Sequence, residues 1–297
     1  MEPLRIACVQ YLNTAPLVEG LDKLKGLAVI PAVPADIAPM VRRGEADLGL
    51  ASIIDAAGTE EPLSVVPAGM IGCDGPTLTV RLFSSVPLEG VTQLCVDADS
   101  HTSVALARVL LAERFGVRPE VFEFNALERM ALGGAKPKQD DEGWPETLLL
   151  IGDKVVTHSP PAVKYAHQLD LGEAWKELTG LPFVYASWMC RTEAISDDAG
   201  RRRVALAAAM LDRQRRHNAT RLDWLVQKWA PHARWPIDHA QHYIAELLRY
   251  EIDERERDAI NRFYGLCASN GLISVESPHI ADLAPPTALP VPSRESE

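Results

Sequence analysis

Short apolar runs alternate with segments of helical period as far as Cys190, a pattern typical of strands that alternate with helices. The apolar runs predicted as strands cover residues 4–9, 27–33, 63–66, 77–83, 91–96, 121–124, 147–151 and 182–190, and residues 46–55 are predicted as a short strand that passes into a helix start. The predicted helices between them cover residues 34–43, 102–115 and 126–132. The loop at 133–146 is rich in Gly, Pro and charge, and we expect it to be exposed.

From Glu193 onward the pattern is helical. The predicted helices cover residues 201–216, 222–229, 239–250 and 254–268. Two successive strand–helix units followed by a helical block predict an α/β architecture with two lobes. The proline-rich tail from Pro278 is expected to lie loosely over the surface.

Four polar segments directly follow predicted strands. They are Tyr11–Asn13, Ala51–Ser52, Asp99–Ser103 and Gly152–Asp153. In α/β folds, ligands bind beyond the carboxyl ends of the strands. The sequence therefore predicts a site between the lobes, where these four segments meet.

The third of these segments is unusually rich in hydroxyl groups. Ser100, Thr102 and Ser103 stand at the start of a predicted helix, where free backbone N–H groups and the helix dipole favour an anion. Ordinary capping of the helix by Asp99 or Ser100 is the alternative interpretation. The hydroxyls exceed what capping requires, so both a carboxylate- or phosphate-binding site and a simple cap remain open.

The other polar positions also have ordinary structural explanations. Asn13 is typical of a helix cap, and an aspartate such as Asp153 at a strand end is more often a cap than a general base. His239 and His242 share one helix face without the partners that a zinc site needs, so no metal is predicted. Gly-x-Gly-x-x-Gly, Gly-x4-Gly-Lys-Ser/Thr and Gly-x-Ser-x-Gly motifs do not occur, and nucleotide-binding loops are not indicated.

Composition narrows the class of protein. The 297 residues carry a net charge of −11, which argues against a nucleic acid or an anionic membrane surface as partner. The five cysteines are scattered without a Cys-x-x-Cys pair, as expected of free thiols in a reducing compartment. The N-terminus has the pattern of a first strand rather than a signal peptide, and we expect a cytoplasmic protein.

Six segments together resemble one known family. They are YLNTAPL (11–17), GEADLGL (44–50), GCDGPTLTV (72–80), SHTSVAL (100–106), LIGD (150–153) and DLGEAWKELTGLPFVYASW (170–188). In this order they are similar to the chorismate dehydratases of the futalosine route to menaquinone, over about residues 5–188. The sister enzyme, 1,4-dihydroxy-6-naphthoate synthase, has a Pro-Cys-Pro-Asn-Asp type motif after its first strand, where this chain has Tyr11-Leu12-Asn13.

The resemblance implies a two-lobed type II periplasmic-binding-protein-like fold with the ligand cleft between the lobes. Lobe 1 is expected to comprise residues 1–86 and 182–275, and lobe 2 residues 87–181. Residues 276–297 are expected to form the C-terminal tail.

The implied reaction converts chorismate to 3-[(1-carboxyvinyl)oxy]benzoate and water. Redox chemistry is not involved, so no cofactor is expected. The resemblance implies three catalytic residues: Asn13, Thr79 and Asp153. It implies six substrate-binding residues: Tyr11, Ser52, Ser100, His101, Thr102 and Ser103. The base is either Asp153 or the substrate's own enolpyruvyl carboxylate.

Two departures from the family pattern affect these expectations. His101 stands where relatives usually have Arg, which predicts weaker or pH-dependent binding of a carboxylate. Thr79 stands where relatives often have Ser, so a hydroxyl is kept and a methyl group is added. The alternative outside the enzymes is a non-catalytic binding protein for a small carboxylate. Such a protein would share the same fold, so the fold does not distinguish the two.

Overall fold

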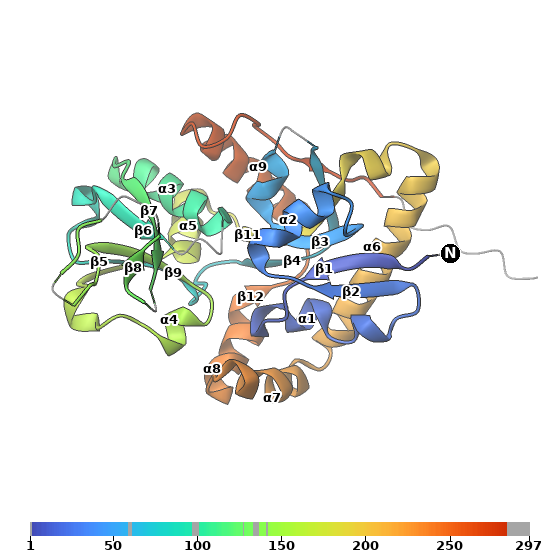
Figure 1. Cartoon of the computed structure of the whole chain (residues 1–297), viewed down its shortest axis with the longest axis horizontal. Helices are drawn as coiled ribbons and strands as arrows, with labels where there is room; N and C mark the ends of the chain where they lie inside the picture. The colour runs from blue at the N-terminus through green and yellow to red at the C-terminus, as the bar shows by residue number, and fades with distance from the viewer. Residues whose placement is uncertain are drawn as a thin grey trace, which may run out of the picture.

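The computed structural model describes residues 2–58, 61–96, 101–126, 128–132, 137–140 and 142–283, and within these ranges the chain forms two lobes around two β-sheets (Figure 1). The predicted α/β architecture with two lobes is therefore confirmed. Within the described residues, none of the helices combines the length and apolar character needed to cross a membrane.

The first lobe is built on a mixed sheet with the strand order β12-β4-β11-β3-β1-β2, to which β13 adds by pairing with β4. Its strands are β1 (Leu4–Cys8), β2 (Leu27–Pro31), β3 (Leu48–Ser52), β4 (Leu63–Cys73), β11 (Phe183–Arg191), β12 (Leu248–Arg249) and β13 (His279–Ile280). β1 pairs in parallel with β2 and β3, so the chain leaves both β1 and β3 at the same edge of the sheet.

The second lobe contains the sheet β10-β5-β9-β6-β7-β8, drawn in green in Figure 1. Its strands are β5 (Val80–Ser84), β6 (Gln93–Val96), β7 (Glu120–Asn125), β8 (Met130–Ala131), β9 (Thr147–Ile151) and β10 (His167–Asp170). β6 is parallel to β9, so the two strands run in the same direction, and residues 152–154 directly after β9 line the cavity between the lobes.

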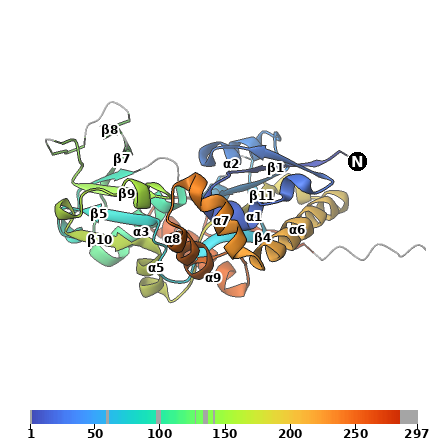
Figure 2. The same ribbon diagram turned by 90° about the horizontal axis from the view of Figure 1, so that it is seen from below.

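Helices cover both sheets and close the junction between them. They are α1 (Ala15–Val18), α2 (Pro34–Arg42), α3 (His101–Phe115), α4 (Lys154–Thr157), α5 (Leu171–Thr179), α6 (Asp198–Ala219), α7 (Leu222–Ala233), α8 (Ile237–Gln241) and α9 (Glu254–Ser269). α2 begins with Pro34, whose fixed φ suits the first turn, and ends before Gly44, which adopts φ +69°. Seen from below, α7 and α8 lie next to the junction of the two lobes (Figure 2).

The chain crosses between the lobes earlier than the resemblance implies. β5 pairs with β9 and β10, so the second sheet begins at Val80 rather than near residue 87. The crossing segment is therefore 74–79, and Thr79 lies in it rather than in a strand of the first lobe. The alternating pattern of 77–83 identifies a strand, but which sheet receives that strand depends on pairing that is distant in the sequence.

Three predicted elements differ from the structure. The helix expected at 126–132 is a turn followed by β8, which pairs with β7. The helix expected at 239–250 is α8 followed by a π-helical turn (His242–Leu247) and β12, which adds to the first sheet. Residues 279–280 form β13 instead of lying loosely, because they pair in parallel with β4. In the second and third cases, main-chain pairing with β4 overrides the local pattern.

Candidate active site

A cavity of about 310 Å³ lies between the lobes, lined by residues of both. Its polar lining comprises Tyr11, Asn13, Thr14, Ser52, Thr77, Thr79, Ser103, Asp153, Lys154, Tyr185 and Tyr243. Its apolar lining includes Val9, Pro34, Leu50, Ile71, Val80, Ile151, Ala186 and Leu248. Apolar walls with a few convergent polar groups are typical of a small-molecule site.

Six of the nine predicted site residues line this cavity: Tyr11, Asn13, Ser52, Thr79, Ser103 and Asp153. They come from the segment after β1, the end of β3, the crossing segment, the first turn of α3 and the segment after β9. The expectation that polar residues at strand ends meet in the cleft describes this arrangement well.

Two predicted site residues lie on the outer side of the lobe junction instead. The Thr102 side chain is fully buried, and its hydroxyl oxygen accepts a 3.3 Å hydrogen bond from the backbone N–H of Ile54. His101 Nδ1 lies 2.7 Å from Asp55 Oδ1, and neither residue is part of the cavity lining. The remaining prediction, Ser100, lies outside the described residues.

Asn13 is held in a tight turn with its amide oxygen buried. The turn is fixed by Thr14, whose hydroxyl donates to the carbonyl of Val9 and accepts from the backbone N–H of Tyr11. Asn13 Oδ1 accepts no hydrogen bond from the part of the chain that the structure describes. A buried acceptor without a partner is costly, so its presence at a cavity wall indicates a ligand that donates to it.

Thr79 and Tyr243 form a hydroxyl pair on the same wall. Thr79 Oγ1 lies 2.7 Å from Tyr243 Oη, and both residues are buried. Burial raises the pKa of Tyr243, and its contacts with Thr79 and Asn13 oppose this rise only in part. The Tyr243 hydroxyl therefore stays protonated and remains a hydrogen-bond donor.

Asp153 joins the lobes across the cavity. Its Oδ1 accepts a 2.8 Å hydrogen bond from Trp235 Nε1, and the Trp235 ring stacks on Tyr243 with centroids 5.1 Å apart. Burial raises the pKa of Asp153 above its usual range, and the Trp235 bond opposes this shift. A carboxylate with a raised pKa is a stronger base than a solvated one.

Trp235 and Tyr243 were not among the predicted site residues. Both belong to the helical C-terminal block, where buried aromatics at helical spacing are typical of a core. The one clue to them is that the resemblance places the C-terminal helices in lobe 1, which borders the cleft. The π-helical turn, an element frequent at functional sites, begins at His242 and contains Tyr243.

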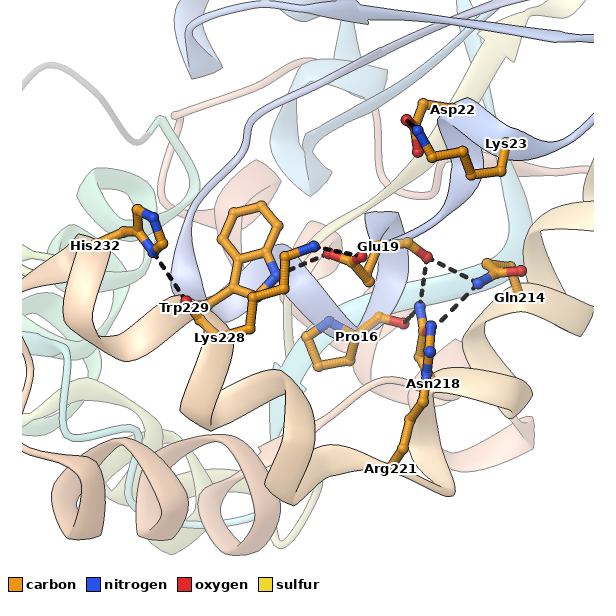
Figure 3. Close-up of polar contacts among 10 residues, drawn as sticks. All are labelled: Pro16, Glu19, Asp22, Lys23, Gln214, Asn218, Arg221, Lys228, Trp229 and His232. Carbon is orange, nitrogen blue, oxygen red and sulfur yellow. Dashed lines mark hydrogen bonds and ion pairs between the residues drawn. The ribbon is translucent and has the colours of Figure 1, made fainter.

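A polar network around Glu19 fixes the helix that leads to Trp235 (Figure 3). The Glu19 carboxylate accepts hydrogen bonds from Lys228 Nζ at 2.6 Å and Trp229 Nε1 at 2.9 Å, both on α7. The Glu19 carbonyl accepts from Gln214 and Asn218 of α6. This network attaches α6 and α7 to the end of α1, which gives the Trp235 side of the cavity a rigid support.

A second hollow of about 420 Å³ adjoins the cavity and shares Tyr11 and Asp153 with it. It is also lined by Lys228, Trp229 and His232, so positively charged or titratable groups stand beside the cleft of an acidic protein. Among the described residues, no group of three or more His, Cys, Asp or Glu side chains could hold a metal ion.

Comparison with solved structures identifies the fold. The chain is similar to the periplasmic aliphatic sulphonate binding protein SsuA of Escherichia coli, with a TM-score of 0.58 and 13% identity over 100% of this chain and 98% of that one. A Candida albicans protein with the periplasmic binding protein fold gives a TM-score of 0.61 and 9% identity over 93% and 92% of the two chains. The expected periplasmic-binding-protein-like fold is confirmed.

The same fold also includes an enzyme. The desulfurization enzyme DSZB gives a TM-score of 0.52 and 10% identity over 93% of this chain and 94% of that one. The fold alone therefore does not distinguish a binding protein from a catalyst.

Sequence comparison is more specific. The chain is 28% identical to the chorismate dehydratase of Thermus thermophilus over 277 residues, 89% of this chain and 94% of the relative. It is 26% identical to the chorismate dehydratase of Campylobacter jejuni over 189 residues, 63% of this chain and 64% of the relative. Residues 4–269 match the family described as menaquinone biosynthesis. This chain therefore belongs to the menaquinone biosynthesis family.

Proposed function

We propose that this protein is a chorismate dehydratase, a hydro-lyase that forms 3-[(1-carboxyvinyl)oxy]benzoate and water from chorismate. The observation that carries the proposal is the composition of the cavity between the lobes. Asn13, Thr79 and Asp153 line one cavity, and the Asn13 amide oxygen has no partner among the described residues. The relatives named as chorismate dehydratases support the choice of substrate.

The proposed reaction needs a base and assistance to a leaving hydroxyl group. The base removes the proton from C3, and the electron pair is delocalised through the C1=C2 bond towards the ring carboxylate. The C4–O bond then breaks, hydroxide leaves with a proton as water, and the ring becomes aromatic. Loss of water is redox-neutral, so the proposal includes no cofactor.

Asn13 and Thr79 are assigned to the departing C4 hydroxyl. The free amide oxygen of Asn13 accepts a hydrogen bond from the hydroxyl and orients it. Thr79 Oγ1 lies 2.7 Å from Tyr243 Oη, and we assign Tyr243 as the donor of this bond, which leaves the Thr79 hydrogen to donate to the C4 oxygen as negative charge develops there. This chain of donors assigns Tyr243 a part in the reaction in addition to the predicted residues.

Asp153 is assigned as the base. It lines the cavity, its pKa is raised by burial, and the Trp235 bond fixes one of its oxygens so that the other is available to the substrate. The substrate's enolpyruvyl carboxylate is the competing base. Replacement of Asp153 by Asn distinguishes the two, as described in the Discussion.

The two substrate carboxylates are assigned to the hydroxyl and cationic groups of the lining. Ser52, Ser103 and Tyr11 supply hydrogen-bond donors, and Lys154 places a positive charge at the wall of the second lobe. These groups come from both lobes, so a bound substrate contacts both.

The direct test is incubation of the purified protein with chorismate alone, with detection of the aromatic product by absorbance and mass spectrometry. We expect turnover without added metal or nucleotide, and unchanged turnover after treatment with a chelator. Calorimetric binding of chorismate without product would instead favour a binding protein. Activity lost to the chelator and restored by a divalent metal would contradict the cofactor-free reaction.

We also place the protein in the cytoplasm. All five cysteines are free and buried, in agreement with a reducing compartment. Fractionation of cells of the source organism, followed by detection with an antibody, tests this assignment directly.

A further inference from the structure

One carboxylate lies at the point where the chain crosses between the lobes. Asp170 ends β10 and caps α5, because its Oδ1 accepts from the backbone N–H groups of Gly172 at 3.0 Å and Glu173 at 3.2 Å. Capping explains these two bonds. It does not explain why the same side chain is also bonded to a second segment more than 90 residues earlier.

That second segment is the crossing segment itself. Asp170 Oδ1 accepts from the N–H of Thr77 at 2.9 Å, and Oδ2 accepts from the N–H of Leu78 at 2.7 Å. The Asp170 side chain is only 3% exposed, and Arg81 Nη2 lies 3.7 Å from Oδ2. Bonds from backbone N–H groups to a buried carboxylate are stronger than those between neutral groups.

The packing at this point leaves no room for a side chain at Gly172. A Cβ atom added at Gly172 would lie 2.1 Å from Thr77 Oγ1 and 2.5 Å from the carbonyl oxygen of Gly75. The first turn of α5 is therefore in direct contact with the crossing segment. This explains why the motif DLGEAW has Gly directly after Asp170 and Leu171.

Leu78 adopts a backbone conformation that L-residues disfavour. Its φ is +70°, in the left-handed region, and a side chain as large as leucine gives no local compensation for this strain. Its N–H donates to Asp170 Oδ2 at 2.7 Å, and its side chain packs against a hydrophobic cluster. The next residue is Thr79, whose side chain lines the cavity and contacts Tyr243.

We propose that Asp170 is a positioning residue, which holds Leu78 in the left-handed conformation and thereby aims the Thr79 hydroxyl into the cavity. The role of Thr79 in this inference rests on the proposed function. Asp170 itself is not part of the cavity lining, so it acts on the reaction only through the backbone of residues 77–79.

The test removes one oxygen of the carboxylate and then relieves the strain. In Asp170→Asn the amide oxygen can take the place of Oδ1, which leaves the amide NH₂ facing the Leu78 N–H. We expect kcat for chorismate dehydration to fall by about ten- to a hundredfold, the effect of losing a hydrogen bond to a charged group, while KM changes by less than about threefold.

Leu78→Gly and Leu78→Ala form a matched pair in the Asp170→Asn background. Both remove the leucine side chain, but only glycine adopts φ +70° without strain. We expect Gly to restore kcat by about tenfold relative to Ala, and to raise the melting temperature of the double variant above that of its Ala counterpart. Glycine is also favoured over alanine at φ +70° when Asp170 is intact, so the same pair is measured in the parental background. A positioning role predicts a smaller Gly-to-Ala ratio of kcat there, because the carboxylate still holds position 78, whereas a purely structural cap predicts the same ratio in both backgrounds.

The outcomes separate this inference from the proposed function. Parental kcat in Asp170→Asn, or equal effects of Gly and Ala at position 78, would overturn the positioning role. If Asp170→Asn alone does not fold, the two double variants decide by melting temperature, and equal behaviour again overturns it. If the parent does not convert chorismate at all, the proposed function fails, while the melting temperatures still test the contact between Asp170 and Leu78.

Discussion

The lobes meet on two sides of the cleft, and the two sides use different chemistry. The inner wall comprises Asn13, Thr79, Asp153 and Tyr243 of the cavity lining, together with Trp235, which is bonded to Asp153. Its hydrogen-bond donors, the Tyr243 hydroxyl and Trp235 Nε1, do not titrate near neutral pH. The outer contact is formed by Ile54, Asp55, His101 and Thr102, and its strongest bond involves an imidazole whose side chain is 49% exposed.

The two sides therefore have different roles. Donors that do not titrate keep their protons at every working pH, which suits groups that orient a substrate, and Asp153 is the ionisable group that they leave to act as the base. An ionisable contact outside the cavity can change how firmly the lobes meet without changing the geometry of the wall. We therefore expect substitutions in the inner wall to alter turnover, and those in the outer contact to alter how firmly the lobes meet or the stability of the protein.

The largest expected effect comes from Asn13→Ala and Thr79→Val. Each should lower kcat by about 10²–10³, the usual cost of removing a transition-state donor or acceptor, while chorismate binding measured by calorimetry is kept. Tyr243→Phe is the matched control for the hydroxyl chain, because it keeps the ring that stacks on Trp235. Parental turnover in Asn13→Ala would show that the reacting face lies elsewhere.

The next effect concerns the base. Asp153→Asn keeps an oxygen that accepts from Trp235 but removes basicity, and we expect kcat to fall by at least about 10². Trp235→Phe keeps the carboxylate and removes its donor, so the loss should be much smaller. Near-normal turnover in Asp153→Asn would assign the base to the substrate's own carboxylate.

Trp235→Phe should also change the pH dependence of kcat/KM in a definite direction. The Trp235 bond lowers the pKa of Asp153 against the larger effect of burial, which raises it. Without this bond the pKa should rise further, and a base must be ionised to act. The acidic limb of the kcat/KM profile should therefore move to higher pH in Trp235→Phe, and an unmoved limb would argue against Asp153 as the base.

The inner wall could be predicted only in part. Asn13, Ser52 and Asp153 directly follow apolar strands, and the rule that ligands bind beyond strand ends places them in one cleft. From the C-terminal block, Tyr243 lines the same cleft and Trp235 bonds to Asp153 at its wall. Their position depends on how α6 and α7 attach to α1 through Glu19. Local periodicity contains no information about such an attachment.

The outer contact shows a second limit of the sequence. Thr102 and Ser103 are neighbours with similar side chains, and the sequence assigns both to the substrate. On a helix, successive residues point about 100° apart, so only one of the two can face the cavity. The docking of α3 against Ile54 sets the rotation of the helix, and this contact is tertiary.

The outer contact should make the attachment of the two lobes to each other depend on pH. Asp55 raises the pKa of His101 above its usual 6.5, with smaller effects of Glu123 in the same direction and of burial and Arg42 in the opposite one. The ion pair is thus fully present below pH 6.5 and is lost as the pH rises through the raised pKa of His101. The KM for chorismate should rise by about two- to threefold across this range, a small effect because the pair is partly exposed. His101→Gln should remove this dependence and leave kcat unchanged, whereas a parallel change in kcat would place His101 on the inner wall.

The smallest effect is expected from Thr102→Val, which changes little volume and removes one acceptor. The backbone N–H of Ile54 then loses its partner at the outer contact, which should lower the free energy of unfolding by about 1 kcal/mol. KM should stay at the parental value, because the Thr102 side chain is not part of the cavity lining.

Ser103→Ala is the matched variant on the adjacent residue, and because Ser103 lines the cavity we expect the reverse result, a raised KM with little change in stability. Thermal unfolding and steady-state kinetics on the same preparations measure both quantities. A raised KM in Thr102→Val with unchanged stability would mean that the hydroxyl reaches the substrate, and the division between the inner wall and the outer contact would then fail at this residue.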